Sequence, residues 1–141
     1  MQLPRVEPLD QSERGSAIIE FLLFGILLLV PLALGMVDVS NYFNALMAGQ
    51  SAAREAARSY SLSPSRHIAE TNAHAIALQV LADSGVQYHD FRLSVVCSAD
   101  PCLTPGASVK AIVDFRTDLR AVSRAIHVED KEPIDSWVVG R

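Results

Sequence analysis

The feature that most constrains this chain is Phe21–Val37, a run of 17 residues without a charged or amide side chain. Extended back to Ala17, the apolar segment covers about 21 residues, or roughly 31 Å of helix, which is the thickness of a bilayer core. Pro31 is tolerated in membrane helices and usually kinks them, so we expect a bend at this residue. The run predicts a transmembrane helix over residues 16–37.

A cleaved secretory signal is a competing interpretation of the same run, because Ala33–Gly35 offers a small-x-small cleavage site. Two features oppose it. The apolar run exceeds the usual length of a signal core, and Glu20 lies near its start, where a signal peptide is basic or uncharged.

Length and charge exclude several classes of protein. The chain has 141 residues and a net charge of −4, with charges of both signs scattered along it. This length allows one domain of modest size and excludes a multidomain enzyme. Without a basic face or an acidic block, nucleic acid is not an expected partner.

Glu20 is the most informative single residue. An acid at mid-bilayer costs about 2.5–3.5 kcal/mol on insertion scales, and such residues are usually paired and functional. The alternative is an ionised side chain that snorkels to the headgroups at the helix start, where the helix dipole favours an anion. Glu20 alone does not separate these two interpretations.

The residues around Glu20 add a resemblance. Residues 13–21, ERGSAIIEF, resemble the processing site of type IV prepilins, in which an aspartyl prepilin peptidase cuts after the glycine at the cytoplasmic face. Residues 49–58, GQSAAREAAR, and the 15-residue leader extend the likeness over Arg14–Arg58. This part of the chain is specifically similar to the TadE-like pseudopilins of tight-adherence (Flp-type) pilus systems.

The resemblance implies a processing site at Gly15 and Ser16 and an assembly role for Glu20 and Phe21. Cleavage after Gly15 creates a cationic amine on Ser16, one helical turn from Glu20. The two charges can then neutralise each other within one chain or between neighbouring chains. Between chains, this pair would set the axial register of one helix against the next.

The helical pattern continues past the apolar run. Apolar or small residues recur at spacings of four and three, namely Val39, Phe43, Leu46, Gln50, Ala53, Ala57 and Tyr60. This predicts one helix from Ser16 to Ser61, amphipathic over residues 38–61. A dimeric coiled coil is an alternative, but alanine and glutamine make weak knobs, so we favour packing against the chain's own globular part.

A second helix of about twenty residues is expected after Leu62, with Ser63 as N-cap and Pro64 at its first position. Gly85 is its expected C-cap. Its apolar face consists of Ala69, Ala73, Ile76, Ala77, Val80 and Leu81.

From Tyr88 the hydrophobic period changes to two, which predicts strands. The alternating residues are Phe91, Leu93, Val95 and Cys97 in one strand and Val109, Ala111, Val113 and Phe115 in the next. Residues 117–124 have turn and helix character, and a weaker third strand is expected from Ile126, Val128, Ile134 and Trp137–Val139, interrupted near Pro133. The expected fold class is α+β, membrane-anchored and pilin-like, with a long N-terminal helix, a short second helix and a small antiparallel sheet of about three strands.

Cys97 and Cys102 flank the loop of the expected hairpin. A disulfide here closes a six-residue loop, contributes about 2 kcal/mol and requires an oxidising compartment. The alternative is two free thiols in a cytosolic domain of opposite topology. Arg5 and Arg14 lie in the leader, whereas Arg54 and Arg58 lie further from the membrane on the other side, which is a slight bias for a leader inside. With the prepilin-like site, this favours the N-terminus inside and the C-terminal domain outside the cytoplasmic membrane.

No catalytic or metal constellation stands out. His67, Glu70 and His74 share one helix face, but the pattern has no second copy on another helix, which favours a solvated face over a metal site. Gly49–Ala53 resembles a nucleophile elbow only loosely, because it lies within a continuous helical pattern. We expect no enzyme activity, metal, cofactor or small-molecule substrate.

The expected organisation is a cytoplasmic leader over residues 1–15, a transmembrane helix over 16–37, its amphipathic continuation over 38–61 and an exported α+β domain over 62–141. The favoured function is a minor pilin or pseudopilin of a Flp-type pilus, a system of cell adhesion. It would be of the TadE or the related TadF type, and would enter the fibre or prime its assembly. Expected partners are membrane lipid, a prepilin peptidase and other pilin and pilus-assembly subunits. The alternative is a signal-anchored single-pass protein whose exported domain binds a ligand or partner.

Overall fold

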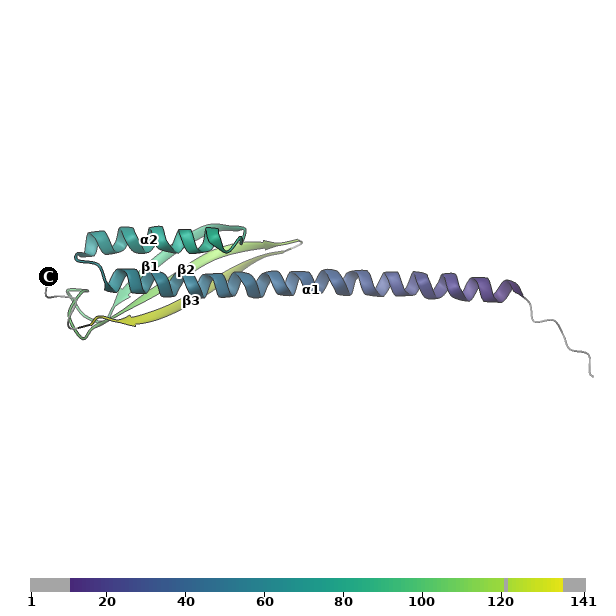
Figure 1. Ribbon diagram of the computed structural model, residues 1–141, viewed down its shortest axis with the longest axis horizontal. Helices are drawn as coiled ribbons and strands as arrows, with labels where there is room; N and C mark the ends of the chain where they lie inside the picture. The colour runs from purple at the N-terminus through teal and green to yellow at the C-terminus, as the bar shows by residue number, and fades with distance from the viewer. Residues whose placement is uncertain (1–10, 121, 136–141) are drawn as a thin grey trace, which may run out of the picture. The chain divides into compact units, whose positions relative to one another are not determined.

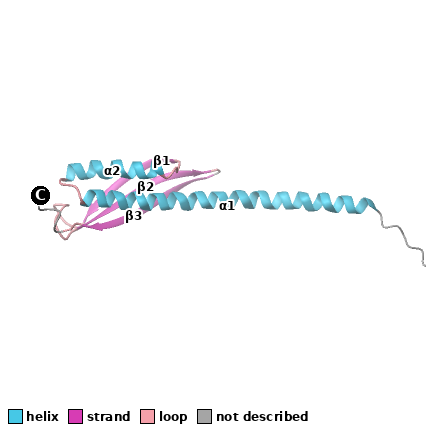
Figure 2. Cartoon of the chain, viewed as in Figure 1, coloured by secondary structure: helices cyan, strands magenta, loops and turns pink. Residues whose placement is uncertain are grey.

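The computed structural model describes residues 11–120 and 122–135, which fall into two compact units, Met1–Val37 and Asp38–Arg141. The elements, labelled in Figure 1 and coloured by type in Figure 2, are α1 (Gln11–Ser61), α2 (Arg66–Asp83), β1 (Tyr88–Cys97), β2 (Ser108–Leu119) and β3 (Val122–Pro133). The fold class expected from the sequence is confirmed: a long apolar N-terminal helix, a short second helix and a three-stranded antiparallel sheet.

The first unit contains the apolar part of α1. Its large side chains are exposed throughout; Phe21, for example, is 77% exposed. Within the described residues, α1 is the one helix long and apolar enough to cross a membrane, and none of its apolar window is buried by the rest of the chain. The helix begins at Gln11, earlier than the expected Ser16, and contains Pro31 without interruption. The bend at Pro31 stays a prediction.

In the second unit, the C-terminal half of α1 packs through small residues. Its buried side chains are Ala45, Ala48, Ala52, Ala53, Ala56, Ala57 and Tyr60. The predicted packing against the chain's own globular part is therefore confirmed, but the predicted stripe is partly wrong. Val39, Phe43 and Gln50 are exposed. The alanines leave little side-chain volume between helix and sheet, so the larger residues lie outside the contact.

Helix α2 begins later than expected, at Arg66, with Ser65 as N-cap and without a side-chain capping bond. The assignment of Ser63 as N-cap and Pro64 as first helical residue is wrong. The Ser63 hydroxyl instead donates to the Ser59 carbonyl, 2.8 Å away, at the end of α1. The C-cap of α2 is Ser84 rather than the expected Gly85. Gly85 comes directly after it with a φ of +70°, the left-handed conformation that a glycine after a helix supplies.

The sheet has the order β1-β2-β3, with antiparallel neighbours. Alternate residues of β2 are buried under the helices, namely Val109, Ala111, Val113 and Phe115. Four residues of α2, Ala69, Ala73, Ala77 and Leu81, belong to the same core. Figure 1 shows α2 and the end of α1 on the sheet.

The third strand is longer and more regular than the sequence indicated. Residues 117–119 continue β2, and Leu119 pairs with Val122 across a tight turn at Arg120. The turn expected within 117–124 is therefore present, but the expected helix character is wrong. The strand β3 is continuous up to Pro133. Proline can end a strand because its missing N–H is then not needed by the ladder. Trp137–Val139 lie outside the described residues.

Candidate functional site

The peptide bond between Gly15 and Ser16 lies inside α1, because the helix begins at Gln11. Both residues precede the part of the helix whose side chains are described. A peptidase that bound this bond in extended form would have to unwind the first turns of α1 around it. Glycine lowers that cost, because it is about 1 kcal/mol less favourable than alanine in a helix interior.

Glu20 and Phe21 both lie exposed on α1. They border a shallow, open hollow of about 490 Å³ on one face of α1. The other residues of this face, which follow one another at helical spacing, are Ala17, Phe24, Gly25 and Leu28. Glu20 is thus surrounded on its own helix by apolar side chains. The ion pairs found among the described side chains all lie beyond Val37, so within that part of the chain Glu20 has no ionic partner.

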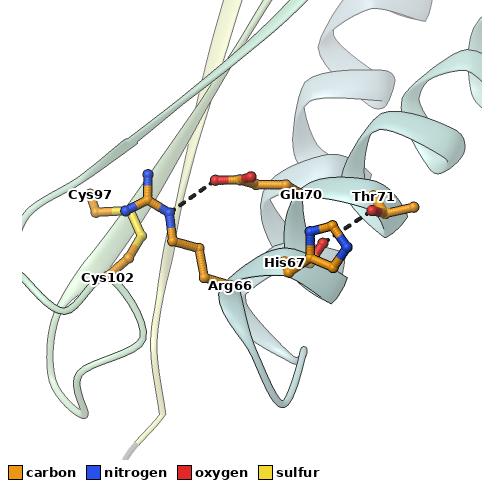
Figure 3. A network of polar contacts seen from close by, with 6 residues as sticks. All are labelled: Arg66, His67, Glu70, Thr71, Cys97 and Cys102. Carbon is orange, nitrogen blue, oxygen red and sulfur yellow. Dashed lines mark hydrogen bonds and ion pairs between the residues drawn. A yellow bond between two sulfur atoms is a disulfide. The ribbon is translucent and has the colours of Figure 1, made fainter.

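The two cysteines lie where β1 ends and the following loop turns back. The Cα atoms of Cys97 and Cys102 are 5.3 Å apart, a disulfide distance, and Figure 3 draws the bond between them. Cys102 is 5% exposed and belongs to the hydrophobic core. The pair thus joins the end of β1 to the loop that leads into β2.

The residues considered for a metal site make other contacts. The Nε of Arg66 donates to Glu70 Oε1 at 2.9 Å, and Thr71 donates to the carbonyl of His67 at 3.0 Å (Figure 3). The hydrogen bond to Glu70 raises the pKa of Arg66 above its ordinary value. The His74 ring meets Phe91 of β1 edge-on, with centroids 5.4 Å apart. The structure therefore places Glu70 in an ion pair and His74 against the sheet.

A groove that sequence reasoning missed lies within the second unit, between α1 and the turn that joins β2 to β3. It has a volume of about 760 Å³, and its walls include Val39 and Phe43 of α1 and Val122 and Arg124 of β3. Asp38 also lines it, 3.7 Å from the Nε of Arg120 in the turn. The Asp38 Oδ1 atom is inaccessible to solvent and accepts no hydrogen bond from the described residues.

A signal for this groove is present in the sequence. Asp38 is the first charged residue after the apolar run, and Arg120 interrupts the alternation between two strands. Their proximity depends on the hairpin register of β2 and β3, which places the turn at Arg120. The turn and helix character predicted for that segment does not bring the two residues together.

Comparison with known protein families gives a match over part of the chain. Residues 15–58 match the family model described as TadE-like protein, which confirms the resemblance over this segment. The matched segment begins at Gly15 and includes Ser16, Glu20 and Phe21. No curated protein and no solved structure matches the chain.

Proposed function

Because residues 15–58 carry the sequence of the TadE-like family, which associates the chain with Flp-type pilus systems, we propose that it is a membrane-anchored pseudopilin that assists pilus assembly. It is inserted with its N-terminus in the cytoplasm and its C-terminal domain outside. A prepilin peptidase removes residues 1–15. The protein itself acts by binding other pilus subunits and catalyses no reaction.

The observation that carries this proposal is the position of Glu20. It follows Ser16 by four residues on α1 and lies exposed among apolar side chains. A carboxylate in such a place needs a partner, because an unpaired charge in lipid is costly. Cleavage after Gly15 supplies one, since the new amine of Ser16 is one helical turn away.

The same pair supports an assembly role. Two helices that lie side by side in lipid gain little from apolar contact, because lipid tails are as apolar as leucine. A carboxylate on one helix and an amine on its neighbour provide a specific attraction between them. The contact between the Ser16 amine of one chain and the Glu20 carboxylate of the next then sets how far one helix is displaced along the other.

The experiment is co-expression of the full chain with a prepilin peptidase, followed by mass spectrometry of the intact protein. We expect a mature chain that begins at Ser16. Gly15→Val should keep the leader, because the peptidase site is expected to accept a residue without a Cβ and the branched side chain of valine would not fit it. Gly25→Val is the matched control, since a Cβ at Gly25 meets nothing within 4 Å.

Two results would contradict the proposal. If the wild-type chain stays uncut in the presence of active peptidase, it is not a pseudopilin. A cut at Ala33–Gly35 instead would make the apolar run a secretory signal, which leaves the exported domain without an anchor.

A further inference from the structure

We propose that the turn between β2 and β3 rests in the lipid headgroup layer and that the groove beside it binds a lipid phosphate. The hairpin tip is defined here as Leu119, Arg120, Val122 and Arg124. The inference rests on the proposed membrane anchoring of α1. It adds a second contact between this chain and the bilayer, made by the folded domain.

One ion pair shows where the hairpin tip lies along α1. Asp38 follows directly on Val37, the last residue of the apolar run, and Arg120 Nε lies 3.7 Å from Asp38 Oδ1. The hairpin tip therefore lies beside the first residue that leaves the hydrocarbon. Lys131, near the other end of β3, is nine residues from Val122, which corresponds to roughly 30 Å along the strand.

The dimensions of a bilayer place the groove in the headgroup layer. The hydrocarbon core is about 30 Å thick and the whole bilayer about 40–45 Å, which leaves about 5–8 Å of headgroups on each side. At a rise of about 1.5 Å per residue along α1, Val39 is at most about 3 Å and Tyr42 at most about 8 Å from the level of Val37, the last residue of the apolar run. Both of these groove residues fall within that layer.

The side chains of the groove suit the chemistry of this layer. Val39, Phe43 and Val122 are 56%, 54% and 50% exposed, although each borders the groove. Water is a poor environment for three apolar side chains at one place, whereas the glycerol and upper acyl region of a lipid would cover them. Aromatic residues and arginines are typical of this boundary, where an apolar stem and a polar tip face opposite environments.

The charges of the groove favour a phosphate. Arg120 and Arg124 line or border it, against the single carboxylate of Asp38, in a chain whose net charge is −4. The Arg120 guanidinium is half-exposed. A guanidinium presents several N–H donors in a plane that matches the oxygens of phosphate. A neighbouring apolar helix would cover the valines and the phenylalanine. Asp38 already faces Arg120, so such a helix would leave Arg124 in a dry contact without an anion among the described side chains.

The test uses the full chain in vesicles of phosphatidylcholine and phosphatidylglycerol in which part of the lipid carries brominated acyl chains. Bromine quenches a nearby tryptophan. The only natural tryptophan is replaced in a Trp137→Phe background. Three single variants then report on three places: Val122→Trp on the hairpin tip, Leu28→Trp on the apolar helix and Lys131→Trp on the far end of β3.

We expect Val122→Trp to lose emission in brominated vesicles, as Leu28→Trp does, and Lys131→Trp to keep it. In the Val122→Trp chain, Arg124→Ala should reduce the quenching and Arg124→Lys should restore it. Arg92→Ala is the matched control, since Arg92 is an exposed arginine of β1 that does not line the groove.

The outcomes separate this inference from the proposed function. If Leu28→Trp is quenched and Val122→Trp is not, the helix is in the membrane and the inference is overturned. If neither is quenched, the anchoring and the inference fall together. Quenching of Val122→Trp that appears only at high protein density would mean that a second protein chain brings the hairpin tip into the lipid, and would overturn the inference. If Arg124→Ala leaves the quenching of Val122→Trp unchanged, the proposed contact between Arg124 and a lipid phosphate is ruled out.

Discussion

Gly49 of α1 lies so close to Phe115 of β2 that a Cβ on the glycine would be 2.9 Å from the phenylalanine Cε1 and 3.1 Å from Val128 Cγ2. Both neighbours belong to the buried core, and Phe115 is 2% exposed. Neither can move away without disturbing its own packing, because protein interiors are close-packed. This contact sets how closely α1 approaches the sheet.

Gly49→Val should therefore destabilise the second unit. Overpacking of a filled core typically costs about 1–3 kcal/mol, and the branched side chain adds two methyl groups where a single Cβ already collides. Chemical unfolding of the full chain in detergent, followed by near-ultraviolet circular dichroism, measures the change. Ser51→Val, at an exposed position of the same helix, is the control for helix propensity. Equal stability of the two variants would show that the sheet can move away from α1.

The contact also predicts a coupling. Phe115→Leu should cost stability alone, because it leaves part of the core unfilled. Combined with Gly49→Val it should cost less than the two single changes together, because the shorter side chain makes room for the valine. A double-mutant cycle measures this difference. Additive costs would mean that Phe115 is not what limits the approach of the helix.

The cysteine pair predicts a local effect. Cys97→Ser with Cys102→Ser should lower the stability of the second unit by about 2 kcal/mol, the chain-entropy estimate for so short a loop. Membrane insertion should be unchanged, since neither cysteine is in the apolar run. Thiol labelling of unreduced wild-type protein tests the bond itself. Rapid labelling of both cysteines in intact cells would show that the bond is absent and would make the outward topology doubtful.

The raised pKa of the buried Tyr60 hydroxyl predicts that the protein loses stability at alkaline pH. Burial raises the pKa of this hydroxyl above 10.0, and the negative charge of Glu70 adds to this, while Arg66 opposes it. Above about pH 10 the unfolded chain releases this proton and the folded chain keeps it, so stability falls as the pH rises. Tyr60→Phe removes the titrating group. The wild type should thus lose more stability than Tyr60→Phe between pH 8 and pH 11, and parallel curves would contradict the prediction.

The sequence predicts the elements of this fold well where hydrophobic period and punctuation agree. The apolar run, the end of α1 at Ser61 and the glycine after α2 are all local features of composition, and each is found in the structure. The strands β1 and β2 also follow from strict alternation. In these segments the local preference and the tertiary environment favour the same structure.

Prediction from the sequence fails where contacts between different elements determine which residues are buried and how the strands pair. Gln50 occupies a helical spacing that favours burial, yet it is exposed, because the sheet meets α1 through Gly49 and the alanines on either side. The polar residues around Arg120 indicate a turn with helix character, yet they extend a hairpin whose register comes from pairs such as Phe115 with Ile126. The groove beside Asp38 depends on that register: the charges of Asp38 and Arg120 can be read in the sequence, but their proximity cannot.

Glu20 provides the decisive test of assembly. Glu20→Ala removes an acid from the apolar helix and so lowers the cost of insertion, which is about 2.5–3.5 kcal/mol for a charge at mid-bilayer. The variant should insert, accumulate and be processed after Gly15 like the wild type. It should nonetheless make few pili, because the amine of Ser16 has lost the carboxylate that fixes its neighbour. Glu20→Gln should retain a small fraction of piliation through hydrogen bonding.

A snorkelling acid at the helix start predicts the opposite result, since an exposed surface charge contributes little and its loss would leave piliation unchanged. Pili are counted on cells that carry each variant at matched protein levels, with processing followed by mass spectrometry. Gly25→Ala is the matched control, because Gly25 lies on the same helix face as Glu20 and a Cβ there meets nothing. Wild-type pilus numbers in Glu20→Ala would rule out the register role of the carboxylate even if cleavage after Gly15 were found, because processing and pairing are separate uses of the same segment.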